Sequence, residues 1–383
     1  MHINADVQNC TVSPISEVTS WLENPDDPDV INVCQAVPSY SPPPDMLSYM
    51  GELARSGTAG EYTDIEGIKA LRTGLARDIN IRYNGDVHPD ELLITAGCNQ
   101  GFCSVIDAIC QRGDNVLLPL PCYFNHEMWL TIRGIEARWL AVDSENAIPD
   151  PQQVEALVDS RTRAICLVTP NNPTGAIYPP EVIEGFFEAC RQHDPQLIVD
   201  ETYRDFMDDS KPPHELFQNP QWREHFIHLY SFSKSFSLTG YRVGAVAASE
   251  QLMAHLLKIQ DCVAICSPHL GQKAAAYGLE HLIPWRRERG LELINRVGAI
   301  RSAFDKPGLN YRIVSAGAYF AWVKHPFDES ALTVARRLAE EFNIACLPGN
   351  YFGDGQEQFF RFAFSNIDES RFPELVERLI TSQ

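Results

Sequence analysis

The chain has 383 residues, enough to bury a large core and to divide into two domains without the help of a metal ion or a disulfide. Its formal net charge of −20 weighs against a nucleic acid or an anionic membrane surface as partner, because both would repel it and no basic stretch offsets the acidic excess. The 11 cysteines are scattered through apolar stretches, none with zinc-site spacing, which indicates free thiols in a reducing cytoplasm. No apolar run reaches the ~18 residues of a membrane span, so we expect a cytoplasmic protein with a small-molecule partner and no metal site.

The first part of the chain is expected to form an arm and then enter a larger unit. A short helix is expected over residues 10–23, and proline-rich loops over residues 24–28 and 41–44 flank a strand over residues 30–33. A helical period of apolar residues follows over residues 64–83, and residues 91–97 read as a strand that ends in a glycine turn. A helix is expected over residues 100–112.

Apolar runs in the middle of the chain predict a wound, largely parallel α/β sheet. These strand-like runs are residues 115–118, 163–169, 196–200, 226–230 and 243–248, with helical patterns between several of them. After about residue 250 a helical pattern extends through residues 285–304, and the last strand-like runs are residues 311–315, 319–323 and 359–364. We therefore expect a large three-layer α/β domain over residues 40–280 and a smaller α+β domain made of residues 1–39 and 281–383.

Lys234 is the most informative residue in the chain. A lysine is normally a solvated surface charge, but this one lies between small hydroxyl residues, after the apolar run over residues 226–230 and before a glycine turn. These neighbours indicate a buried amine, and an amine held away from water has a lowered pKa and can form a Schiff base with a carbonyl. Ser231, Ser233 and Arg242 add hydroxyl donors and a cation, which suit a phosphate.

Three other polar segments fall where predicted strands end. Residues 95–99 begin a helix whose free backbone N–H groups could hold a phosphate, although an ordinary strand-to-helix turn has the same pattern. Residues 170–176 form a turn whose asparagine could donate to a phenolate oxygen, although turn-forming asparagine is the commoner explanation of such a pattern. Asp200 ends an apolar strand, where a buried carboxylate could pair with a protonated pyridine nitrogen. A helix cap or a structural ion pair is the alternative for this aspartate.

Taken together and in this order, these segments resemble the class I and II aminotransferases of pyridoxal-phosphate fold type I. The resemblance extends from about residue 14 to the end of the chain. Its motifs are Tyr62 with Gly67 and Leu71-Arg72, Thr95-Ala-Gly97, Pro119-Leu-Pro-Cys-Tyr123, Asn171-Asn-Pro-Thr-Gly175, Asp200-Glu-Thr-Tyr203, Ser231-Phe-Ser-Lys234 with Gly240-Tyr-Arg242, Pro348-Gly349 with Phe352-Gly353, and Arg361.

The resemblance implies pyridoxal 5′-phosphate as cofactor and a role for each matching residue. Lys234 would form the Schiff base and then act as the base and acid of the proton shift. Asp200 would hold the pyridine nitrogen, Asn172 and Tyr203 would bind the ring 3′-oxygen, and Tyr123 would stack on the ring. The phosphate would be held by Gly97, Cys98, Asn99, Ser231, Ser233 and Arg242, and by Tyr62 of a second subunit. The resemblance therefore implies a homodimer with shared active sites.

Arg361 is the expected partner of the substrate α-carboxylate. A guanidinium offers a planar fork for a carboxylate, and the family places its carboxylate arginine at this position. A surface arginine on an edge strand is the other interpretation. The remaining expected substrate contacts are Ala36, Asn172 and Tyr123. Ala36 stands where the family usually has a glycine, and no second arginine for a dicarboxylate side chain can be assigned.

The sequence therefore predicts an aminotransferase that moves an amino group from an L-α-amino acid to a 2-oxo acid by a ping-pong mechanism. A β-lyase that cleaves carbon–sulfur bonds is the alternative, because the same fold and lysine remove the same α-proton. A non-catalytic binding or regulatory member is a third possibility, but it predicts a missing lysine or an added DNA-binding segment, and the sequence has neither.

Overall fold

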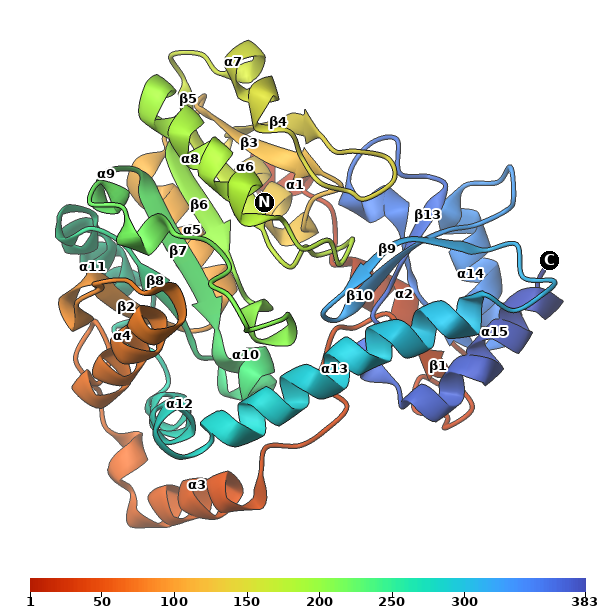
Figure 1. Cartoon of the computed structure of the whole chain (residues 1–383), viewed down its shortest axis with the longest axis horizontal. Helices are drawn as coiled ribbons and strands as arrows, with labels where there is room; N and C mark the ends of the chain where they lie inside the picture. Colours follow the sequence, from red (N-terminus) through yellow and green to blue (C-terminus); the bar gives the residue numbers. More distant parts are fainter.

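A seven-stranded sheet forms the centre of the larger part of the molecule in the computed structural model, which describes residues 1–383 (Figure 1). The strand order is β2-β8-β7-β6-β5-β3-β4. Strand β8 is antiparallel to both of its neighbours, and all the other pairs are parallel. The strands are β2 (Leu92–Thr95), β3 (Asn115–Leu120), β4 (Glu136–Ala141), β5 (Thr162–Val168), β6 (Gln196–Asp200), β7 (Phe226–Ser231) and β8 (Gly244–Ala247).

Helices cover both faces of this sheet, because successive residues of the buried strands point to opposite sides. On β5, Ile165 and Leu167 belong to one apolar core, whereas Ala164 and Cys166 belong to another. The first core includes α3 (Pro44–Ser56), α4 (Lys69–Tyr83), α8 (Pro180–His193) and α12 (His269–His281). The second includes α5 (Cys98–Ile109), α6 (Phe124–Arg133) and α11 (Glu250–Ala264). The predicted three-layer α/β architecture is confirmed.

A smaller α+β unit lies beside the large sheet (Figure 1). Its antiparallel sheet has the order β12-β13-β10-β9, and the short strands β1 and β11 pair in parallel nearby. Helix α13 (Ile283–Phe304) runs between the two units (Figure 1). The elements of this unit are β1 (Ile31–Asn32), β9 (Arg312–Gly317), β10 (Phe320–Lys324), α14 (Ala331–Phe342), β11 (Ile344–Ala345), β12 (Leu347–Pro348), β13 (Phe359–Phe362) and α15 (Phe372–Thr381).

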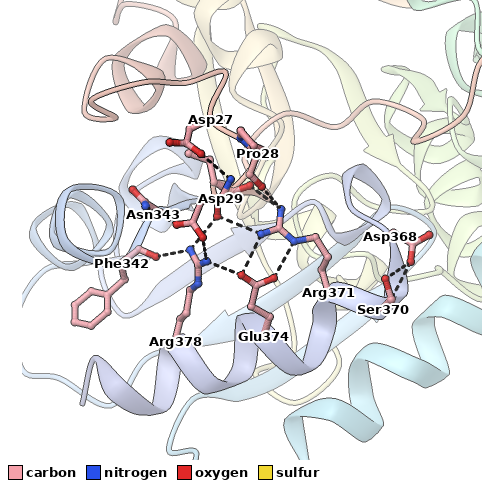
Figure 2. Close-up of polar contacts among 11 residues, drawn as sticks. Asp27, Pro28, Asp29, Phe342, Asn343, Asp368, Ser370, Arg371, Glu374 and Arg378 are labelled. Atoms are coloured by element: carbon pink, nitrogen blue, oxygen red, sulfur yellow. Dashed lines mark hydrogen bonds and ion pairs between the residues drawn. The ribbon is translucent and has the colours of Figure 1, made fainter.

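Two arginines fasten the segment before β1 to helix α15 (Figure 2). Arg371 donates to the backbone carbonyls of Asp29 at 3.1 Å and Val30 at 2.9 Å. Arg378 pairs with the Asp29 carboxylate at 2.6 Å, and Glu374 accepts from both guanidinium groups. Because the chain continues from β1 toward the large sheet, this anchor helps to fix the position of the segment that follows β1.

The structure differs from the predicted elements mainly where proline or glycine sets a boundary. The helix expected over residues 10–23 is shorter in the structure, where α2 (Pro14–Thr19) begins at a proline that suits the first turn of a helix. A further short helix, α1 (Ala5–Asn9), lies before the predicted range. Pro44 likewise begins α3 where a loop was expected. Helix α4 begins at Lys69 rather than at residue 64, since Gly67 has a φ of 99°. The remaining short helices are α7 (Val154–Leu157), α9 (Trp222–His225) and α10 (Phe232–Ser235).

None of the helices combines the length and the apolar character that a membrane crossing requires. All 11 cysteines are free thiols.

Candidate active site

A cavity of about 310 Å³ opens at the carboxyl ends of the parallel strands. It lies where open α/β sheets bind their ligands. Most of the residues singled out from the sequence line it, and these are Ala36, Cys98, Asn99, Tyr123, Asn172, Asp200, Tyr203, Ser231, Ser233, Lys234, Arg242 and Arg361. Gly97 does not line the cavity but directly precedes α5 at its edge. Tyr62 also does not line it, and its side chain is 78% exposed elsewhere on the surface.

Lys234 reaches the cavity from the short helix that follows β7. Ser231 caps this helix, because its hydroxyl accepts from the backbone N–H of Ser233 at 3.2 Å. The Lys234 amine donates to the carbonyl of Ala36. Burial, reinforced by the positive charges of Arg361 and Arg242, lowers the pKa of this amine from 10.5 to about 7. The lysine is therefore available as an uncharged base near neutral pH.

Asp200 ends β6 and is buried without a cationic partner. Its Oδ1 accepts from the hydroxyl of Thr202 at 2.7 Å and from the backbone N–H of the same residue at 2.9 Å. Its Oδ2 lies 3.7 Å from Nε2 of His126. Burial lowers the pKa of His126 to about 3, so this imidazole is neutral, and burial raises the pKa of Asp200. A positively charged ligand group at the free oxygen would compensate the carboxylate.

Arg361 is the reverse case, a buried cation without an anion. It lies on β13, which pairs with strands on both sides, and it is 2% exposed, so the edge-strand interpretation is wrong. Its Nη1 donates to Oδ1 of Asn172 at 3.0 Å, and its Nη2 donates to the carbonyl of Cys34. Its Nε is buried without a partner, and burial lowers the pKa of the guanidinium. A ligand carboxylate would supply the missing charge.

Asn172 and Tyr203 present free donors to the same cavity. The Asn172 carbonyl oxygen is taken by Arg361, and its amide nitrogen makes no hydrogen bond within the chain. Burial raises the pKa of Tyr203 well above its usual value, so its hydroxyl stays protonated. Tyr123, which follows β3, donates instead to Oδ1 of Asn125 at 2.7 Å, which fixes its ring at the wall of the cavity.

The amino end of α5 and Arg242 form a cradle for an anion. Gly97 precedes the helix with a φ of 88°, and a side chain added there would collide with the Arg242 guanidinium. A Cβ atom at Gly244 would lie 2.6 Å from the backbone nitrogen of Cys98. Arg242 is held by the carbonyls of Thr239 at 2.9 Å and Ala96 at 3.3 Å. Free N–H groups, a helix dipole and a fixed cation at one point suit a phosphate.

Comparison with known proteins identifies the family. The family model for aminotransferase class I and II matches residues 28–379. The chain belongs to this family. The relatives of this aminotransferase include the aromatic aminotransferase ISS1 of Arabidopsis thaliana, 28% identical over 376 residues that cover 96% of this chain and 92% of the relative. The arginine–pyruvate transaminase AruH of Pseudomonas aeruginosa is 31% identical over 303 residues, 76% of this chain and 75% of the relative.

Solved structures agree with this assignment. The aspartate aminotransferase of Thermotoga maritima is 25% identical to this aminotransferase and superposes with a TM-score of 0.88 over 99% of both chains. A mutant aspartate aminotransferase of Thermus thermophilus has a TM-score of 0.90 over the whole of both chains at 23% identity, which shows the shared fold.

This protein is therefore a pyridoxal-phosphate-dependent aminotransferase that acts on amino acids and 2-oxo acids. The predicted family, fold and cofactor are confirmed, and the relatives do not favour the carbon–sulfur lyase. The residues present also fit the cofactor. Asp200 lacks a cation that a pyridine nitrogen would supply, Lys234 offers a neutral amine, and the start of α5 offers a place for the phosphate.

Sequence reasoning missed several residues in or behind the cavity. His126 stacks on Phe102 with ring centroids 3.9 Å apart and supports Asp200 from α6. No local pattern marks this histidine, because its partner lies far along the chain. His126 itself does not line the cavity, and the unforeseen residues that do are Ser13, Ile15, Gln35, Val37, Phe124, Asn125, Val168, Thr202 and Thr239.

Proposed function

We propose that this aminotransferase moves an amino group between an L-α-amino acid and a 2-oxo acid in the cavity described above, with Lys234, Asp200 and Arg361 in the central roles. One observation supports the proposal most strongly. A buried carboxylate without a cation, a buried guanidinium without an anion and an amine with a pKa of about 7 meet in one cavity. A pyridinium would compensate the carboxylate, a substrate carboxylate would compensate the guanidinium, and the amine could accept a substrate α-proton.

The cofactor is proposed to lie between the start of α5 and β6. Bound pyridoxal phosphate supplies a carbonyl carbon that accepts the amino group and a protonated ring that withdraws electrons from the substrate α-carbon. Asp200 holds the ring nitrogen, the donors of Asn172 and Tyr203 hold the ring oxygen, and Tyr123 covers a ring face. The phosphate is held by Gly97, Cys98, Asn99, Ser231, Ser233 and Arg242.

Arg361 and Lys234 then act on the substrate itself. Arg361 fixes the α-carboxylate, which limits the rotation of the substrate and presents its α-hydrogen to Lys234. The Lys234 amine takes this proton as a base and returns it as an acid. Its low pKa makes both steps accessible near neutral pH. Ala36, whose carbonyl accepts from the lysine amine, lies beside the substrate.

The two half-reactions use the same residues in opposite directions. The donor amino acid leaves as its 2-oxo acid before the acceptor 2-oxo acid enters, so one carboxylate partner serves both. This order of events is the ping-pong mechanism expected from the sequence.

A homodimer is proposed as the working assembly. Tyr62 is 78% exposed and lies outside the cavity of its own chain, which suits a residue that serves a second copy. The backbone N–H of Thr63 donates to Cys266 Sγ at 3.4 Å, which brings a second exposed hydrophobic residue, Ile265, near this tyrosine. The large domain is proposed to span residues 40–280, and the small domain residues 1–39 and 281–383. The acidic composition and the free thiols support a cytoplasmic location.

The test is to add single L-amino acids to the purified, pyridoxal-phosphate-loaded protein without an oxo acid. The visible spectrum and the release of ammonia are followed together. Stoichiometric conversion of the bound cofactor to pyridoxamine phosphate without ammonia is the expected result, and it identifies the donor. Continuous release of ammonia with the original spectrum restored would overturn the proposal in favour of β-elimination.

A further inference from the structure

Glu201 follows Asp200 directly, yet its side chain lies on the other side of the strand end. It is completely buried. Its Oε2 lies 2.9 Å from Nε2 of His228 and 3.4 Å from Nε2 of His214, and it accepts the hydroxyl of Tyr83. These three partners come from β7, from the loop before residue 216 and from the end of α4. None of them lines the cavity.

A carboxylate with no access to water is costly unless it is paired and hydrogen-bonded. Burial opposes ionisation of Glu201, but the two histidines outweigh it and hold the pKa of the carboxyl well below its usual range. Burial raises the pKa of Tyr83, so its phenol remains a donor, and burial lowers the pKa of His228 to about 4. The chain therefore maintains a charged group at a position that plays no direct part in the reaction.

The turn that follows Glu201 is held from behind by further buried contacts. The backbone N–H of Glu201 donates to the carbonyl of Leu229 at 2.9 Å, and the N–H of Arg204 donates to the Glu201 carbonyl at 3.1 Å. The Arg204 side chain, also fully buried, pairs with Asp78 at 2.5 Å and lies 4.0 Å from the ring centroid of Tyr230. One side of the turn thus faces the cavity, and the other is fixed to a buried ionic cluster.

We propose that Glu201 is a positioning residue of this aminotransferase: anchored by Tyr83, His214 and His228, it fixes the turn that presents Asp200 and Tyr203 to the cofactor. The inference rests on the cofactor roles proposed above for Asp200 and Tyr203. Tyr83, His214, His228 and Arg204 are the titratable groups that face Glu201. The network acts through the turn, because no member of it touches the cavity.

The test compares Glu201→Gln with Glu91→Gln in the pyridoxal-phosphate-loaded protein. Glu91 is a matched control, because it is 3% exposed and paired with Arg223 at 2.5 Å, but lies at the opposite end of the sheet from the cavity. Three quantities are measured: the pH midpoint of the visible absorption change of the bound cofactor, the dissociation constant of the cofactor, and the thermal unfolding midpoint.

Both substitutions are expected to lower the unfolding midpoint, but only Glu201→Gln should change the cofactor. With Tyr203 less firmly placed at the ring oxygen, the pH midpoint should rise by at least about 0.5 unit. Cofactor affinity should fall about tenfold, equivalent to roughly 1.4 kcal/mol. Glu201→Asp, which keeps the charge, should recover part of both effects. If Glu201→Gln loses stability while the pH midpoint and the affinity remain those of the unaltered protein, Glu201 is merely structural and the inference is wrong.

Two further variants keep the result interpretable. Tyr83→Phe removes one donor and keeps the ring, so it should fold and shift the pH midpoint in the same direction by a smaller amount. An unchanged midpoint in this variant, if Glu201→Gln does not fold, would also overturn the inference. Tyr203→Phe changes a residue assigned to the cofactor, so an unchanged midpoint there would contradict the proposed function rather than the role of Glu201.

Discussion

Two buried charges define what the cavity can bind. An uncompensated charge in a protein interior costs several kcal/mol. A fold that keeps one carboxylate and one guanidinium apart in the same cavity is therefore suited to ligands that bring one positive and one negative charge. Asp200 and Arg361 are such a pair, and each also has hydrogen bonds that orient it. In the proposed function, the cofactor ring would compensate the charge of Asp200 and the substrate carboxylate that of Arg361.

Lys234→Ala should still bind pyridoxal phosphate noncovalently but lose nearly all turnover, because no other amine lines the cavity. Equilibrium dialysis measures the binding and a coupled oxo-acid assay the turnover. Lys258→Ala, an exposed lysine on α11, is the control and should leave both unchanged. Retention of more than a small fraction of turnover by Lys234→Ala would remove the basis of its assignment.

The low pKa of Lys234 also predicts how its removal changes stability with pH. In the cofactor-free protein the folded state gives up the proton near pH 7, whereas the unfolded chain keeps it until about 10.5, so stability rises with pH across this window. Lys234→Met should raise the unfolding midpoint most at or below about pH 7, and the gain should shrink toward pH 10. Calorimetric scans at several pH values measure it, and a gain independent of pH would contradict the buried amine.

Arg361→Ala should weaken substrates that carry an α-carboxylate by roughly 2 to 5 kcal/mol in kcat/KM, the range for truncating one partner of a buried charged pair. Arg361→Lys should recover only part of this loss, since an ammonium group lacks the planar fork. The comparison uses an amino acid and the matching amine without its carboxylate. If the unaltered protein prefers the amine, Arg361 has another role.

At the scale of elements, the start of α5 combines a glycine conformation with a close approach. Gly97→Ala and Gly113→Ala should each cost stability of about 1 to 2 kcal/mol, because both positions have a φ near 90°. Only at Gly97 would the new methyl group meet a side chain, the Arg242 guanidinium, whereas nothing lies within 4 Å at Gly113. Cofactor affinity, measured by titration of tryptophan fluorescence, should therefore fall in Gly97→Ala alone. An equal loss in both variants would assign the effect to backbone strain.

Elements whose pattern is local could be predicted from the sequence. The buried strands of the large sheet read as continuous apolar runs, and β6 was predicted with the bounds it has in the structure. Helix α3 was missed because the prolines before it suggested a loop, although a proline in the first turn stabilises a helix start. The two-residue strands β11 and β12 have no pattern of their own, since they exist only through pairing with distant segments.

The candidate site divides in the same way. Lys234, Asp200 and Arg361 lie in short segments whose residue types already indicate a chemistry. His126 and the partners of Glu201 could not be found, because single histidines and tyrosines become informative only when folding brings them to a carboxylate. Burial also decides which interpretation of an arginine holds, and burial of Arg361 depends on strands on both sides of β13.

At the scale of the whole molecule, the proposed dimer explains why one expected cofactor contact lies outside the cavity. Every other cofactor residue lines the cavity or borders it, but Tyr62 projects into solvent on the surface that also exposes Ile265. Aromatic residues such as tyrosine are enriched where one protein surface covers another. If Tyr62 serves the second subunit, each cavity is completed by the other copy.

This sharing of residues can be tested by mixing two defective subunits. A subunit with Lys234→Ala has no base but retains Tyr62, and a subunit with Tyr62→Ala has the base but cannot complete its partner's site. In a mixed dimer, one cavity combines an intact Lys234 with an intact Tyr62, while the other carries both defects. Activity at limiting cofactor should therefore recover on mixing and refolding the two, toward one working site per mixed dimer. Mixing Lys234→Ala with Arg361→Ala is the control. Both residues belong to their own subunit's cavity, so each site of the mixed dimer keeps one defect and no activity should return. No recovery with Tyr62→Ala would mean that Tyr62 does not act across the interface, and equal recovery in the control would mean that the recovery does not come from sharing of Tyr62.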